Sequence, residues 1–129
     1  MSHILLIEPN TLLAKVYTQA LMQAGHSVAH VTGAQAAINA ADKNRPAVVI
    51  SELQLSQHSG IEFLHEFRSY AEWIGIPVIL NTSLVAKQIA PVAGALRRDL
   101  GVREILYKPR TSLQDLVRAV REHASVSSS

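Results

Sequence analysis

The chain has 129 residues, of which 48% are hydrophobic and 17% charged, and its formal net charge at pH 7 is +2. Such a length and composition are typical of one globular domain with a sizeable core. The sequence contains no cysteine, which excludes disulfides, thiol nucleophiles and thiolate metal sites. The charge is too small to indicate nucleic-acid binding and no apolar run is long enough to span a membrane, so we expect a cytoplasmic protein that contacts neither.

Strands and helices are predicted to alternate five times along the chain. Runs of apolar residues predict strands at residues 3–7, 27–31, 47–51, 76–80 and 104–107. Apolar residues at helical spacing predict helices at residues 13–24, 34–42 and 61–67, within 85–100, and from 113 onwards. This alternation is typical of an α/β fold with a doubly wound five-stranded parallel sheet. We expect one domain over residues 1–124 and a disordered Ser-rich tail over residues 125–129.

Polar residues and glycines mark several of the predicted helix ends. Asn10 or Thr11 is expected to cap the first helix, and Thr32 the second. Gly25 and Gly101 are expected to end the first and fourth helices, because glycine readily adopts the left-handed conformation found there.

One carboxylate lies at the end of the most apolar strand. Residues 47–51 are small and mostly β-branched, which is typical of a strand buried on both faces, and the next residue is Glu52. Glu8, Thr82 and Lys108 lie at the ends of the first, fourth and fifth strands. The carboxyl ends of parallel strands share one edge of the sheet, where functional groups gather. We therefore expect these four side chains to converge on one shallow site.

The order and spacing of these residues resemble those of the receiver domains of bacterial two-component response regulators. Glu52 lies 44 residues after Glu8, and Thr82 lies 30 residues after Glu52, as in that family. Gly60 matches a loop glycine of the family, and Lys108-Pro109 matches its Lys-Pro pair. The resemblance covers residues 3–123 and implies a flavodoxin-like (βα)5 fold.

The resemblance also implies a role for each residue of this set. In the family, an aspartate accepts a phosphoryl group from a histidine kinase, while an acidic pair and a backbone carbonyl help to hold Mg²⁺. A Thr or Ser binds the phosphoryl oxygens, and a Lys before a usually cis Pro neutralises charge. The residues at the corresponding positions are Glu52, Glu8, Pro9, Gln54, Thr82, Lys108 and Pro109.

Three departures from the family pattern concern the chemistry of the site. The extra methylene of Glu52 moves its carboxylate about one bond length further out, and in-line transfer tolerates such misplacement poorly. Pro9 removes one carboxylate of the acidic pair, so we expect no cofactor, or at most weak Mg²⁺ binding through Glu8 and Glu52. Ile105 stands where the family has an aromatic residue that switches together with the Thr82 position.

We interpret the chain as a divergent receiver domain that is not phosphorylated conventionally, is not an enzyme and acts by protein–protein interaction. Glu52 is then either a built-in mimic of the phosphorylated state or a vestigial acid paired with Lys108. Two alternatives remain: Glu52 is a working phosphoacceptor with Mg²⁺, or the flavodoxin-like crevice binds a small molecule.

The resemblance further implies a protein partner, which is a histidine kinase, a phosphotransfer protein or an output protein. We expect this partner to bind the face formed by the fourth helix, fifth strand and fifth helix. We expect the chain to be a monomer or a homodimer. Candidate contact residues on that face are Val92, Leu96, Arg103 and Arg121.

Overall fold

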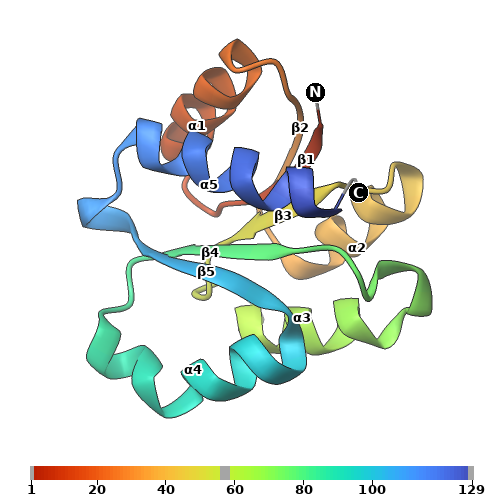
Figure 1. Cartoon of the computed structure of the whole chain (residues 1–129), viewed down its shortest axis with the longest axis vertical. Helices are drawn as coiled ribbons and strands as arrows, with labels where there is room; N and C mark the ends of the chain where they lie inside the picture. The colour runs from red at the N-terminus through yellow and green to blue at the C-terminus, as the bar shows by residue number, and fades with distance from the viewer. Residues whose placement is uncertain (1, 56–58, 128–129) are drawn as a thin grey trace.

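The structure is a computed structural model that describes residues 2–55 and 59–127 (Figure 1). Its strands are β1 (His3–Ile7), β2 (Ser27–Val31), β3 (Val48–Ser51), β4 (Val78–Thr82) and β5 (Val102–Tyr107). Its α-helices are α1 (Thr11–Gln23), α2 (Ala34–Lys43), α3 (Gly60–Ser69), α4 (Ala86–Leu100) and α5 (Leu113–Ser127). Two short 3₁₀ turns, η1 (Ala71–Trp73) and η2 (Lys108–Arg110), precede β4 and α5.

The five strands form one parallel sheet in the order β2-β1-β3-β4-β5. Helices α1 and α5 cover one face, and α2, α3 and α4 cover the other (Figure 1). This arrangement confirms the predicted flavodoxin-like (βα)5 fold. Within the described residues, no helix combines the length and apolar character needed to cross a bilayer.

The sheet separates two hydrophobic cores. Alternate residues of each strand enter opposite cores, so that Val49 packs under α2 and α3 while Ile50 packs under α1 and α5. Strand β3 is therefore buried on both faces, as the sequence predicted. Trp73 packs in the core with its ring stacked on Phe67, at a centroid separation of 5.0 Å.

Most of the predicted helix ends are confirmed, and one is corrected. Asn10 caps α1 by accepting a hydrogen bond from the Leu13 N–H, and Gly25 follows its end at φ +97°. Gly101 ends α4 at φ +69°. Gly33, and not Thr32, is the N-terminal cap of α2, because the chain stays extended for one more residue.

Helix α5 continues to Ser127, so it includes three residues that the sequence placed in a disordered tail. Residues 128 and 129 of that predicted tail lie outside the described residues. Every peptide bond in the described part of the chain is trans, including the one before Pro109, which the family resemblance had suggested is usually cis.

Arg68 links several backbone segments at the end of the sheet opposite the predicted site. Its guanidinium donates to the main-chain carbonyls of Leu100, Trp73, Ile74, Ile76 and Gly101. Burial, together with the neighbouring Arg103, lowers the pKa of Arg68 to about 10. Because the Leu100 and Gly101 carbonyls close α4, Arg68 also neutralises the negative end of that helix. One side chain thus joins α3, the segment before β4 and the end of α4.

We predict that Arg68→Met lowers the free energy of unfolding by about 3 kcal/mol, because the main-chain carbonyls that it contacts, most of them in partly buried hydrogen bonds, lose a charged donor. Urea unfolding of both proteins measures the difference. Arg45→Met is the matched control, since exposed Arg45 donates one bond, to the Glu72 carbonyl, and its loss should cost less than about 1 kcal/mol. Equal losses in the two variants would show that Arg68 does not have this structural role.

Candidate functional site

Three charged side chains converge where β1, β3 and β5 end. Glu8 follows β1, Glu52 follows β3 and Lys108 opens the turn η2 after β5. The Lys108 ammonium lies 2.7 Å from Glu8 Oε1 and 2.8 Å from Glu52 Oε1. Both carboxylates are buried, and the Lys108 side chain is only 13% exposed. The convergence predicted from the sequence is therefore present, with Lys108 between the two acids.

The Glu52 carboxylate accepts more hydrogen bonds than it has lone-pair directions to accept them. Oε1 accepts from the Lys108 ammonium and from the Ser83 N–H at 3.1 Å. Oε2 accepts from the Thr82 hydroxyl at 2.5 Å and from the N–H groups of Leu53 and Gln54 at 2.7 and 3.1 Å. A carboxylate has about four acceptor directions, so these donors saturate it.

Ser83 and Gln54 form a hydrogen bond beside Glu52, and the sequence analysis did not identify Ser83 as a site residue. The Ser83 hydroxyl donates to Gln54 Oε1 at 2.7 Å, which connects the segment after β4 to the segment after β3. The same hydroxyl lies 3.3 Å from Glu52 Oε1. Because a serine has a single proton to donate, the shorter bond to Gln54 is the stronger of the two.

Gly60 holds the chain after β3 close to Glu52. Its N–H donates to the Leu53 carbonyl at 2.7 Å. A Cβ at this position would lie 2.7 Å from Leu53 Cα and 2.8 Å from the Glu52 carbonyl oxygen, which is too close for any side chain. Glycine at residue 60 thus lets α3 begin directly against the backbone of the site.

Hydrogen bonding keeps both members of the central pair ionised. Burial raises the pKa of the Glu52 carboxyl, but hydrogen bonds from Lys108, Thr82 and the Gln54 N–H more than compensate and bring its pKa below the usual value. Burial likewise lowers the pKa of Lys108, and its bonds to Glu52 and Glu8 reverse this, so its pKa is raised. The pair is a charged one at neutral pH.

The oxygens of this site do not fit a magnesium ion. Glu8 Oε1 is paired with Lys108, and Glu8 Oε2 accepts from the Asn10 N–H at 2.9 Å. The oxygens of Glu52 are saturated, and Pro9 has no side-chain oxygen. Mg²⁺ requires octahedral oxygen coordination at short distance. In this arrangement the Lys108 ammonium supplies the positive charge that the two carboxylates need.

The Thr82 hydroxyl makes two hydrogen bonds in this site. Besides donating to Glu52, its Oγ1 accepts from the Leu84 N–H at 3.2 Å, which fixes the start of the segment leading to α4.

Ile105 is half-buried against α4 and borders a groove of about 260 Å³. The other residues of that groove are Ala86, Ile89, Ala90, Ala93 and Arg97.

One candidate contact residue on the face formed by α4, β5 and α5 is corrected by the structure. Leu96 is only 1% exposed, because it belongs with Ile89 and Leu100 to the inner stripe of α4. It is a core residue and cannot contact a partner. Arg103 and Arg121 are exposed, and Val92 is partly buried.

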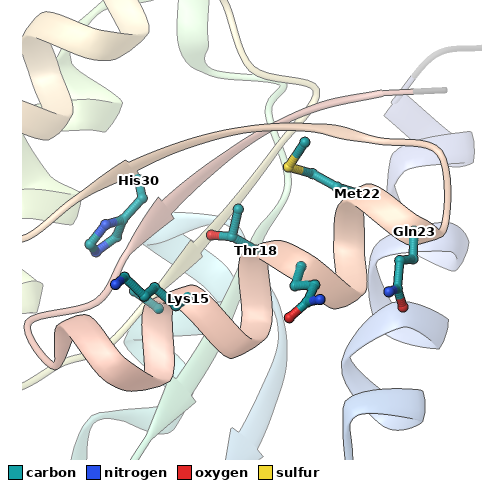
Figure 2. A pocket seen from close by; sticks show the side chains of 7 residues that line it. Lys15, Thr18, Met22, Gln23 and His30 are labelled. Atoms are coloured by element: carbon teal, nitrogen blue, oxygen red, sulfur yellow. The ribbon is translucent and has the colours of Figure 1, made fainter.

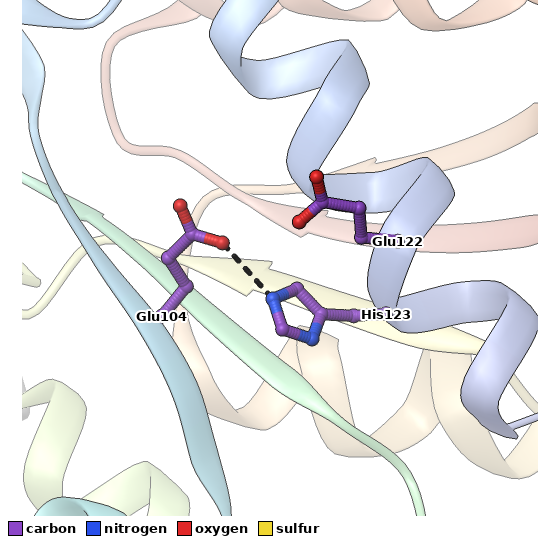
Figure 3. A group of neighbouring side chains, drawn as sticks. All are labelled: Glu104, Glu122 and His123. Carbon is purple, nitrogen blue, oxygen red and sulfur yellow. Dashed lines mark hydrogen bonds and ion pairs between the residues drawn. The ribbon is translucent and has the colours of Figure 1, made fainter.

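A second cluster of titratable side chains lies between β5 and α5, where Glu104, Glu122 and His123 approach one another (Figure 3). Arg118 lies 2.7 Å from Glu104 and 3.0 Å from Glu122, and His123 Nε2 lies 2.9 Å from Glu104. Hydrogen bonds from Arg118 and His123 outweigh burial and lower the pKa of Glu104. The cluster is an ion-pair network that ties α5 to the edge strand β5.

The lowered pKa of Glu52 predicts a specific dependence of stability on pH. Its contribution is fully present above the unfolded-state pKa of about 4.3 and is lost as the pH falls through the lower folded-state pKa. Glu52→Gln should therefore be less stable than the wild type at pH 7, and this difference should shrink below about pH 4. Urea unfolding over a pH series measures it.

The exposed Glu72 provides the control for this experiment, because Glu72→Gln should follow the wild type at every pH. A difference between wild type and Glu52→Gln that stays constant from neutral to acidic pH would contradict the lowered pKa of Glu52.

Comparison with known proteins agrees with this geometry. Residues 4–121 match the profile of the response regulator receiver domain. The probable transcriptional regulatory protein TcrX of Mycobacterium tuberculosis H37Rv is 34% identical over an alignment of 117 residues that covers 86% of this chain and 49% of that protein. The chain thus spans about half the length of this curated relative.

Two solved structures share the fold. The chemotaxis protein CheY4 of Vibrio cholerae superposes with a TM-score of 0.84 at 20% identity, over 95% of this chain and 98% of that one. The receiver domain of the sensor histidine kinase PA1611 of Pseudomonas aeruginosa PAO1, solved with magnesium in its active-site cleft, gives 0.84 at 21% identity, over 96% and 98%. With the profile match over most of its length, this chain belongs to the response regulator receiver domain family of two-component signalling systems.

Proposed function

We propose that this receiver domain is a protein-binding signalling module, not an enzyme, in which the Glu52 carboxylate takes the place of an acyl phosphate. One observation carries the proposal: Glu52 accepts from the Thr82 hydroxyl and from the Lys108 ammonium. These groups correspond to those that bind and neutralise the phosphoryl group in the family. A side chain that already satisfies them supports a site that mimics the phosphorylated state.

The same contacts argue against Glu52 as a conventional phosphoacceptor. An attacking carboxylate oxygen needs a free lone pair directed at phosphorus, and both oxygens of Glu52 are engaged by donors. Phosphorylation would also have to detach Lys108 and Thr82 from Glu52 before they could bind the incoming group. Pro9 and the paired Glu8 leave few oxygens for the magnesium ion that such a transfer uses.

The partner is proposed to bind the face formed by α4, β5 and α5 through an acidic surface. Between residues 86 and 124, six exposed residues are Lys or Arg and three are Asp or Glu, with Lys108 left out because it is paired with Glu8 and Glu52. The basic surplus on this side favours a negatively charged partner. The alanine-lined groove between α4 and Ile105 is suited to an apolar side chain of that partner, with Arg97 beside it. A kinase, a phosphotransfer protein or an output protein fits this description.

Amide NMR with Mg²⁺ and beryllofluoride, an analogue of an acyl phosphate, tests the proposal. In the wild type we predict that the amide signals of Leu53, Ser83 and Lys108 do not shift. The double variant Glu52→Asp, Pro9→Asp shortens the acceptor and restores the second acid, so its signals should shift in a saturable, Mg²⁺-dependent way. Pro9→Asp alone is the matched control and should behave as the wild type.

Two outcomes would overturn the proposal. One is a saturable, Mg²⁺-dependent shift in the wild type. The other is a stable phosphoryl adduct on Glu52 after incubation with a small phosphodonor, absent from Glu52→Gln. Either result would make this domain a working phosphoacceptor with an unusual side chain.

A further inference from the structure

Strand β2 is an edge of the sheet and has β1 as its neighbour on one side alone within the described part of the chain. Hydrogen bonds from Ser27 N–H to the Ser2 carbonyl and from Glu8 N–H to the Val31 carbonyl bracket the β1–β2 ladder. In a parallel ladder, alternate residues of a strand bond to the same neighbour. Ser27, Ala29 and Val31 therefore face β1, and the main-chain groups of Val28 and His30 point outward.

These outward groups have no hydrogen-bond partner among the residues that the structure describes. The His30 side chain is held separately, because its Nε2 donates to the Glu8 carbonyl at 2.9 Å. The edge thus offers two N–H groups and two carbonyls in extended geometry. Such an edge readily pairs with another strand.

The two edge strands, β2 and β5, differ in how they are protected against pairing with a strand of another chain. Strand β5 carries Arg103 and Glu104, and Glu104 is tied to α5 by its ion pair with Arg118 and its hydrogen bond with His123. The register of β5 with β4 is irregular between Val78 and Ile79. Charges and such irregularities discourage edge-to-edge pairing. The sequence of β2, Ser-Val-Ala-His-Val, contains no Lys, Arg, Asp, Glu, Pro or Gly. It lacks every one of these protective features.

The helix beside β2 presents apolar side chains to solvent. On α1, Leu12 is 71% exposed, Val16 40% and Met22 59%, and of these three Met22 alone lines the groove beside β2. Lys15 is the single charged residue of the helix. A groove of about 550 Å³ runs between α1 and β2, with Lys15, Thr18 and Met22 on one side and His30 on the other (Figure 2). If another strand paired with β2 and extended the sheet, a helix covering that strand would pack against this groove.

We propose that two copies of this chain associate through β2. The strand pairs antiparallel with β2 of the second copy about a twofold axis at Ala29, and the two sheets become one. Val28 then faces His30 of the second copy, and each pair exchanges both N–H···O bonds, so the four free groups of each edge are satisfied. The edge is complementary to itself, which is what a twofold interface requires.

The twofold axis also keeps the two Lys15 ammonium groups apart. It brings the two α1 helices side by side on one face of the joined sheet, running in opposite directions. Lys15, near the start of α1, then lies beside Met22 of the second copy, near the end of that helix. The two Lys15 ammonium groups are at opposite ends of the interface. No like charges of β2 or α1 are brought together.

Sedimentation equilibrium over a concentration series, combined with amide hydrogen exchange, tests this dimer. We expect a concentration-dependent dimer in which the amides of Val28 and His30 exchange slowly at high concentration and rapidly on dilution. Val28→Pro removes an outward N–H and leaves the ladder to β1 intact, so the dissociation constant should rise at least about tenfold. Val28→Ala keeps the N–H and is the control, with a change under about threefold.

A pair of charge variants at exposed Met22 keeps the test independent of any effect of proline on folding. Met22→Lys places a cation beside Lys15 of the second copy and should weaken the dimer. Met22→Glu offers that lysine a partner and should not. A monomer at all concentrations, or a dimer in which the Val28 and His30 amides exchange freely, would overturn the proposal. The latter would indicate association through another face. Neither result bears on Glu52, which the beryllofluoride experiment probes separately.

Discussion

The site depends on one ammonium group held between two buried carboxylates. Taking Glu8 and Glu52 out of water is unfavourable unless each finds a charged partner, and Lys108 lies within 2.8 Å of both. Because these residues follow β1, β3 and β5, the contact also joins three strand ends that are separate in sequence. Removing the lysine would leave two uncompensated acids at the edge of the sheet.

The remaining donors of the site arrange themselves around Glu52. Its side chain turns back over its own backbone, accepting from Leu53 and Gln54, and meets Thr82 and Ser83 on the other side. A longer acid than aspartate reaches all of these groups at once. Under the proposed function, this one carboxylate takes the donors that a phosphoryl group would otherwise use.

The charged site and the lateral edges of the sheet lie in different parts of the domain. The charged site is at the carboxyl ends of the strands, and Arg68 fastens the opposite ends. At the two edges of the sheet, the Glu104–Arg118 ion pair and the Glu104–His123 hydrogen bond tie β5 to α5, whereas β2 contains no charged residue and has an unpaired edge in the described part of the chain.

The sequence by itself determined the order of the elements, the parallel sheet and the convergence of Glu8, Glu52, Thr82 and Lys108. Hydrophobic periodicity and the shared edge of parallel strands suffice for these, because both are local or follow from topology. The Ser83–Gln54 bond, the inward position of Leu96, the five bonds of Arg68 and the extension of α5 through residue 127 were decided by the tertiary structure. Each depends on which distant backbone or side chain comes within hydrogen-bond or packing distance, and no periodic pattern along the chain encodes that distance.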